Sequence, residues 1–195
     1  MRVFGSWDSE EIHMNVLHNS RSKCGRCGKI IISPLGNPDS PYLLVGDFPG
    51  YHETIQGSPV AFRQKPTQTF SGDILKAELT RAGIMFNGVF VTNLWQHQKD
   101  EKTCDLALHL DQLVTLFKDK THVLLMGSDV TQALLGVNVN VVSGIQVKVP
   151  GFGKIHFWVS PNPALVYAQP IGELRLAFRR FVEDIRKKEM LRGVV

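Results

Sequence analysis

The fold of this chain is decided by the stretch Tyr42-Leu-Leu-Val-Gly46-Asp47-Phe48-Pro49-Gly50-Tyr51-His52-Glu53. Residues 42–46 form a short apolar run that ends in glycine, and an acidic residue and a Pro-Gly pair follow it. This pattern predicts a buried strand that delivers the Asp47 carboxylate and a tight turn to one edge of a sheet. Ligands bind outside the carboxyl ends of the strands in open α/β folds. We therefore expect the functional site to lie where this strand ends.

Length and composition bound the class of protein. The chain has 195 residues, a hydrophobic fraction of 43% and a charged fraction of 21%, which predicts a single globular domain over residues 1–195. The net charge of +4 favours a polyanionic partner such as nucleic acid. No apolar run reaches membrane-spanning length and the N-terminus lacks the apolar core of a signal peptide. We expect an intracellular, cytoplasmic protein, and a monomer.

Strands and helices are expected to alternate along the chain. Apolar runs predict strands at 42–46, 88–92, 122–126 and 154–159, and helical periodicity predicts helices at 9–18, 72–82, 104–118, 128–135 and 171–190. Residues 19–41 and 47–71 are expected to be long connections, and residues 141–149 to form a hairpin with the last strand. This order predicts a three-layer α/β/α sandwich around a mostly parallel four-stranded sheet.

Several short motifs follow one another in a specific order. They are a Cys-x-x-Cys at 24–27, Gly-acid-x-Pro-Gly at 46–50, Gly-x-Pro at 57–59, Ser-Gly-x-x-Leu at 71–75, Thr-Asn at 92–93, a helix headed by Cys104, Met-Gly at 126–127 and Pro-Asn-Pro-Ala at 161–164. Each motif is weak alone, but this order resembles the uracil-DNA glycosylase superfamily, closest to its iron–sulfur-containing branch, often called family 4. The resemblance covers nearly the whole chain after residue 22. It implies a monofunctional enzyme that hydrolyses the N-glycosidic bond of uracil, or a related deaminated pyrimidine, in DNA during base excision repair.

The chemistry of such an enzyme assigns roles to two polar residues. A glycosylase must bind a base outside the stack and stabilise positive charge on the sugar and negative charge on the departing base. By resemblance, Asp47 would position or activate the attacking water, and Asn93 would read the Watson–Crick edge of uracil, since an amide both donates and accepts. Alternatively, Asp47 caps the turn at 48–53 and Asn93 bonds its own loop.

The sequence departs from the family pattern at two points. Val60 stands where the family has an aromatic residue after Gly-x-Pro, which leaves Phe62, and then Phe48 or Phe70, as the candidate platform for the base. Asn162 stands where the second motif normally presents a histidine. A neutral amide there would stabilise the departing base less, so the resemblance implies weaker activity or a different substrate. The Pro-Asn-Pro pattern is similar to the mismatch-specific uracil and thymine glycosylase branch.

Four residues form a candidate metal-binding set. Cys24 and Cys27 have ligand spacing, and three cysteines make a poor disulfide framework. By resemblance, the third and fourth ligands would be His97, where the iron–sulfur branch has a cysteine, and Cys104. The resemblance implies a [4Fe–4S] cluster, and the same four residues suit structural zinc. A metal-free Cys-x-x-Cys loop is the remaining alternative.

Basic residues on the loops after the first two strands are candidate phosphate contacts: Arg63, Lys65, Lys99 and Lys102. Two other classes of function stay open. One is a catalytically weak or inactive glycosylase-fold protein that binds DNA or a protein partner, because fold does not determine function. The other is a zinc-ribbon-like accessory protein, in which the Cys-x-x-Cys is the main feature.

Overall fold

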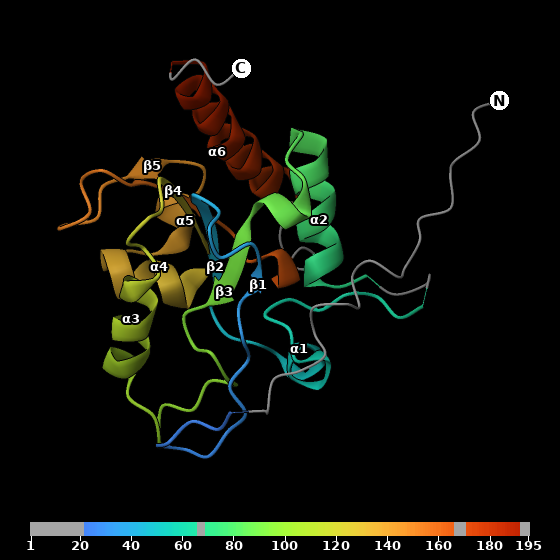
Figure 1. The fold of residues 1–195 in the computed structure, drawn as a ribbon, viewed down its shortest axis with the longest axis vertical. Helices are drawn as coiled ribbons and strands as arrows, with labels where there is room; N and C mark the ends of the chain where they lie inside the picture. Colours follow the sequence, from blue (N-terminus) through green and yellow to red (C-terminus); the bar gives the residue numbers. More distant parts are fainter. Residues whose placement is uncertain (1–21, 66–68, 166–170, 192–195) are drawn as a thin grey trace.

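The computed structural model describes residues 22–65, 69–165 and 171–191, which contain one six-stranded sheet with the order β1-β3-β2-β4-β6-β5 (Figure 1). The four inner strands are mutually parallel: β3 (Phe90–Asn93), β2 (Tyr42–Gly46), β4 (His122–Met126) and β6 (His156–Ser160). Two-residue edge strands, β1 (Leu35–Gly36) and β5 (Gln146–Val147), pair antiparallel. The four predicted strands and their parallel arrangement are thus confirmed, but the sheet is mixed and has six strands: β5 belongs to the predicted hairpin, and β1 was not predicted.

Helices cover both faces of the sheet, because the inner strands are apolar on both sides. Leu43 and Val45 point to one face, where they join α3 (Leu106–Thr115), α4 (Ser128–Leu135) and α5 (Val139–Val142) in one apolar core. Leu44 points to the other face, where α2 (Ser71–Ala82) and α6 (Ile171–Leu191) complete a second core. Figure 1 shows α2 and α6 on the opposite side of the strands from α3 and α4. The predicted α/β/α sandwich is confirmed.

The element boundaries correct several predictions. The helices predicted at 72–82, 128–135 and 171–190 are α2, α4 and α6, whereas α3 is shorter than predicted because Asp105 caps its N-terminus by accepting the N–H of Ala107 at 2.9 Å. The expected connection at 47–71 contains the six-residue helix α1 (Tyr51–Gln56). The hairpin of β5 with β6 is confirmed, but residues 139–142 are helical. The helix predicted at 9–18 lies outside the described residues.

Helix α6 carries a continuous apolar stripe on one side. Its buried residues are Leu174, Ala177, Phe178, Phe181, Val182 and Ile185, and charged residues occupy the opposite side. Among the described residues, no helix is both long enough and apolar enough to cross a membrane.

A polar cluster ties α6 to the amino-terminal half of the inner strands. The Oδ2 atom of Asp184 lies 2.6 Å from His156 Nδ1 and 3.5 Å from His122 Nε2, and it accepts the indole N–H of Trp158 at 3.1 Å. Burial opposes ionisation, but the hydrogen bonds from Trp158 and His156 together hold the pKa of Asp184 below its ordinary value. The ionised carboxylate therefore stabilises the packing of α6 on the sheet.

We predict that Asp184→Asn lowers the free energy of unfolding at pH 7 by about 1–3 kcal/mol, because a charged hydrogen-bond acceptor is lost. A carboxyl whose folded-state pKa is lowered contributes stability above its unfolded pKa, about 3.9, and this contribution is lost as the pH falls through the folded-state pKa. The free energies of unfolding of the two proteins should therefore draw together as the pH falls below about 3.9 and converge below the folded-state pKa. Urea denaturation at pH 7 and pH 3 measures this, with the exposed Asp111→Asn of α3 as control. An equal difference at both pH values would contradict the ionic role.

Candidate functional site

The residues predicted for catalysis leave the sheet at neighbouring points of its carboxyl edge. Gly46, at the end of β2, pairs with Asn93 of β3 on one side and with Met126 of β4 on the other. Met126 in turn pairs with Ser160, at the end of β6. Asp47, which follows Gly46, and Asn162, two residues beyond β6, therefore project from the same edge.

The carboxylate of Asp47 is buried between β2 and the start of α4. Its Oδ1 accepts the backbone N–H of Val130 at 3.0 Å, and its Oδ2 accepts the side-chain amide of Asn162 at 3.4 Å. Burial is the main cause that raises the pKa of Asp47, the charge of Asp129 adds to it, and the two hydrogen bonds offset part of it. The alternative of a cap on the turn at 48–53 is wrong: Asp47 caps helix α4.

Glycine at position 127 makes this arrangement possible. Its backbone has φ 129° and ψ 178°, a conformation that is almost confined to glycine. A Cβ built on Gly127 would lie 2.1 Å from Asp47 Oδ2, so a side chain at this position would displace the carboxylate. The sequence showed the Met-Gly pair at the end of the strand, but it gave no sign that this glycine makes room for Asp47.

The side chain of Asn93 is also buried and turned inward. Its amide nitrogen donates to the backbone oxygen of Pro59 at 2.9 Å. Its Oδ1 lies over Gly46, where a Cβ would approach it to 2.3 Å. Asn93 thus bonds a distant loop, residues 57–62, and fixes it against the edge of the sheet.

Helix α1 holds the same loop from the other side. Gln56 and Phe62 exchange two hydrogen bonds, each 2.8 Å long, between the side-chain amide and the backbone. Glu53 accepts the Ser71 hydroxyl at 2.7 Å and the Ala61 N–H at 3.3 Å. Glu53 and Gln56 could not be recognised from the sequence, because a helix of six residues is too short to show an apolar period.

The candidate aromatic platforms differ in what they contact. Phe48 follows Asp47 directly and is 43% exposed. Phe62 is half-buried, meets Phe86 edge-on at 5.5 Å between ring centres, and lies over Gly72 at the start of α2. Phe70 lies against His52, with ring centres 4.6 Å apart. Of the three, Phe48 presents the most accessible ring beside Asp47.

The predicted basic residues fall into two groups. Lys99 and Lys102 line an open depression together with Phe48, Pro49 and Tyr51. Lys99 is paired there, with its Nζ 2.7 Å from both Asp129 Oδ2 and Glu101 Oε1, and these contacts raise its pKa.

Lys102, Arg63 and Lys65 are exposed. Arg63 and Lys65 belong to the connection before α2, where the Arg63 backbone N–H donates to Asp73 at 3.0 Å. These three side chains project from the loops that follow β2 and β3.

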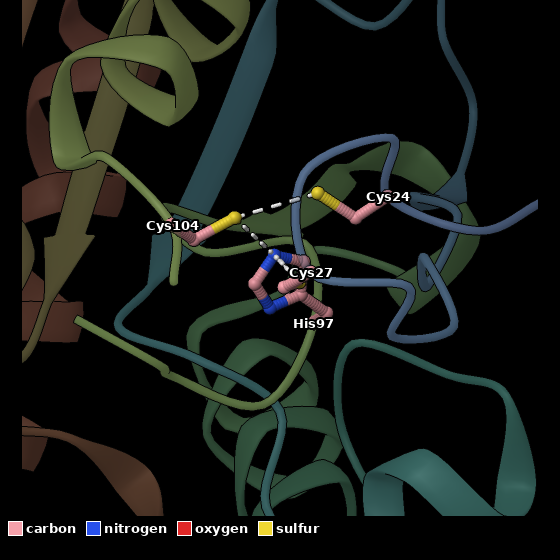
Figure 2. A group of neighbouring side chains, drawn as sticks. All are labelled: Cys24, Cys27, His97 and Cys104. Atoms are coloured by element: carbon pink, nitrogen blue, oxygen red, sulfur yellow. Dashed lines mark hydrogen bonds between the residues drawn. The ribbon is translucent and has the colours of Figure 1, made fainter. Parts of the chain in front are cut away.

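The four predicted metal ligands converge on one point (Figure 2). Cys104 Sγ lies 3.4 Å from Cys24 Sγ and 3.4 Å from His97 Nε2, and Cys27 Sγ lies 3.4 Å from the same nitrogen. All four donor atoms fall within 4.8 Å of one another, and the three thiols are free. The set could hold a metal.

The surroundings of these ligands orient and polarise them. His97 Nδ1 lies 2.8 Å from the carbonyl oxygen of Gln98, which only accepts, so Nδ1 carries the proton and Nε2 offers its lone pair to the cysteines. The backbone N–H of Cys27 donates to the Cys24 sulfur and lowers its pKa, whereas burial raises the pKa of Cys104. A bound cation would favour the thiolate form of all three cysteines.

The fold and this edge define an α/β protein with a buried carboxylate and amides at the carboxyl ends of parallel strands. The family model described as the uracil DNA glycosylase superfamily matches residues 33–186. The chain belongs to this superfamily, which supports a glycosylase-like function and DNA as the partner. A comparison with curated proteins finds no match. The superfamily match covers His97 and Cys104 and begins after Cys24 and Cys27, and it does not confirm the iron–sulfur branch.

We predict that Gly127→Ala destabilises the protein by more than the roughly 1–3 kcal/mol expected from backbone strain alone, because the new methyl group also displaces the Asp47 carboxylate. Gly136→Ala is the matched control at the other end of α4. Gly136 has φ 69° and nothing within 4 Å of a built Cβ, so strain should act there alone, at about 1 kcal/mol. Chemical denaturation measures both variants, and equal losses would show that the contact with Asp47 is unimportant.

Proposed function

We propose that this protein is a monofunctional DNA glycosylase that hydrolyses the N-glycosidic bond of uracil, or of a related deaminated pyrimidine, and leaves an abasic site. The observation that carries the proposal is the meeting of Asp47 and Asn162, 3.4 Å apart, at the carboxyl edge of a sheet with the superfamily fold. Both residues come from motifs that the sequence assigned to the site, and 115 positions separate them. The edge combines an acceptor for water with a donor for the departing base.

In this proposal, Asp47 holds and activates the attacking water. A carboxylate offers about four lone-pair positions, and the contacts with Val130 and Asn162 occupy two of them. Water bonds to the sugar carbon as the carbon–nitrogen bond breaks, the base keeps the electron pair, and Asp47 accepts the proton from water. The negative carboxylate also stabilises the positive charge that develops on the sugar. The cap on α4 fixes Asp47, so little reorganisation is needed.

The proposed recognition of the base uses Asn93, with Phe48 as the stacking surface and Phe62 as the alternative. The Asn93 amide nitrogen and the Pro59 carbonyl bond each other, so a base with matching donors and acceptors can exchange for this contact. Asn162 would donate to a base oxygen. It carries no charge, so its contribution to a developing negative charge is smaller than that of a histidine.

The ion pairs of Lys99 support the proposed absence of strand cleavage. A bifunctional glycosylase needs an unprotonated amine as nucleophile. Lys99 lies in the depression beside Phe48, but its pairing with Asp129 and Glu101 raises its pKa and keeps it protonated. Lys102, Arg63 and Lys65 are exposed and are the proposed phosphate contacts.

We predict that the protein converts uracil-containing oligonucleotides into alkali-labile products, and that Asp47→Asn lowers the rate by roughly 100-fold or more, the usual range for loss of a general base. The Asn side chain can still accept the Val130 N–H, so the cap on α4 should remain and the protein should stay folded, although the new amide nitrogen would face that of Asn162. Gel separation after alkali treatment measures the rate on single- and double-stranded DNA. Folded protein that yields no abasic product on either substrate would exclude this function.

The acid side of the pH profile checks the role of Asp47 separately. Because the pKa of Asp47 is raised by burial, wild-type activity should fall while the pH is still above about 3.9, the ordinary value for aspartate. The residual activity of Asp47→Asn should lack this fall. An identical acid limb in both proteins would assign the titration to another group.

We predict that Asn93→Ala raises the activation free energy of uracil excision by about 1–3 kcal/mol, which lowers the rate roughly 5- to 150-fold. The loss of general DNA affinity should be smaller. The matched control is Gln56→Ala, which frees the same loop at Phe62 and leaves the Asn93 amide in place. Single-turnover rates and binding to an abasic-analogue duplex separate the two effects. If both variants lose the same activity, Asn93 acts only by holding the loop.

A second candidate function is a catalytically inactive protein of this fold that binds DNA. This function is favoured because polar groups of the candidate site already have partners within the protein. The Asn93 amide donates to Pro59, and Lys99 pairs with two carboxylates. Salt-dependent binding to uracil-containing DNA with no abasic product would support this function over the first.

A further inference from the structure

The turn that carries Cys24 and Cys27 is closed by its own backbone. The N–H of Cys24 donates to the oxygen of Lys29 at 2.8 Å, and the N–H of Gly28 donates to the oxygen of Cys24 at 2.8 Å. Gly28 has φ 69°, and Lys23 forms an isolated antiparallel bridge with Ile30. These contacts direct both thiols toward a single point, as a site for one ion requires.

The separations of the four donor atoms distinguish one ion from a cluster. In a tetrahedral zinc site with Zn–S bonds of about 2.3 Å and Zn–N bonds of about 2.0 Å, neighbouring donors stand roughly 3.5–3.8 Å apart. Three contacts in the set are 3.4 Å, and all four donors lie within 4.8 Å of one another. On a [4Fe–4S] cube each ligand bonds a different iron, which puts the donors roughly 6 Å apart. The donors stand closer together here than that arrangement would place them.

The ligand types and their burial agree with a closed structural site. Three cysteines and one histidine form one of the common structural zinc sets. Four protein ligands fill the tetrahedron of a zinc ion and leave no open position for a substrate. His97 is fully buried and Cys24 and Cys104 are each 6% exposed, whereas Cys27 is partly exposed. The Gln98 carbonyl fixes the His97 tautomer that offers Nε2.

We propose that Cys24, Cys27, His97 and Cys104 hold one zinc ion, in place of the iron–sulfur cluster that the sequence resemblance implies. The ion would join the turn at 24–30 to the loop that follows β3. Two further contacts bridge the same segments: the Ile32 N–H donates to Gln96 at 2.6 Å, and Lys29 lies 3.2 Å from Asp100. The role of zinc is then to fix the loop that begins beside Asn93.

The neighbouring His109 offers a matched control. It is buried, its ring centre lies 4.7 Å from that of His97, and among the described residues neither of its ring nitrogens has a hydrogen-bond partner. His109 does not belong to the set of converging donor atoms. His109→Phe keeps an aromatic ring against Trp95 and His97 and removes both nitrogens.

The test is the metal content of the full chain, purified without oxygen from cells grown with both iron and zinc. We expect one zinc per chain, no iron, no acid-labile sulfide and no visible absorption. Replacement by Co²⁺ should give the spectrum of a tetrahedral thiolate site. About four iron and four sulfide atoms per chain with a brown colour, or no bound metal, would overturn the proposal.

Variants test the ligand set independently of any glycosylase activity. His97→Cys should keep one zinc, since four thiolates also form a tetrahedral site, and should strengthen the cobalt–sulfur absorption. His97→Ala should weaken zinc binding by roughly 100-fold or more, measured by competition with a chromogenic chelator. His109→Phe should bind zinc as the wild type does. If His109→Phe loses zinc and His97→Ala retains it, the fourth ligand is His109 and not His97, and the assignment is overturned.

Discussion

The buried carboxylate of Asp47 is the contact on which the arrangement of the carboxyl edge depends. It joins the end of β2 to the first turn of α4 through Val130, and to the segment after β6 through Asn162. An unpaired carboxylate at this depth would be costly, so both partners must stay in place while it is ionised. Gly127 contributes by having no side chain: the space that a Cβ would fill holds the carboxylate. The Asp47 carboxylate therefore carries the negative charge of this edge, caps helix α4 and holds the segment after β6 in place.

The loop after β3 is anchored at both of its ends. At its start, the N–H groups of Leu94 and Trp95 donate to the backbone oxygens of Gly46 and Asp47, at 2.8 and 2.9 Å. At its end, His97 and Cys104 meet the turn that carries Cys24 and Cys27. The converging cysteines and the candidate catalytic edge thus share one segment of chain. If the proposed metal binds there, it would also restrain the segment that begins beside Asn93 and is hydrogen-bonded to the backbone of Asp47.

The features that could be predicted from the sequence are the strands, which are apolar runs, and the site residues, which lie in the ordered motifs. Strands 42–46 and 122–126 agree with β2 and β4 because both are continuous apolar segments. The family resemblance implied that Asp47 and Asn162 share one site and that His97 and Cys104 share another, and the structure brings each pair together. Helix α1 and strand β1 escaped prediction because six and two residues carry no period. The roles of Gly127 and of the Pro59 carbonyl depend on backbone atoms brought together by the whole fold, which no local pattern encodes.

The internal hydrogen bonds of the edge constrain how a base can bind there. Asn93 and Pro59 satisfy each other, so a ligand gains little by replacing one of them unless it also satisfies the other. Uracil presents an N–H donor between two carbonyl acceptors, and it can therefore serve the Pro59 oxygen and the Asn93 nitrogen together. Cytosine has an acceptor at the central position, so in the register that uracil takes it would leave the Pro59 carbonyl facing a lone pair. In the proposed function, selectivity against the normal base follows from this mismatch, because a buried acceptor left unpaired costs more than a good contact gains.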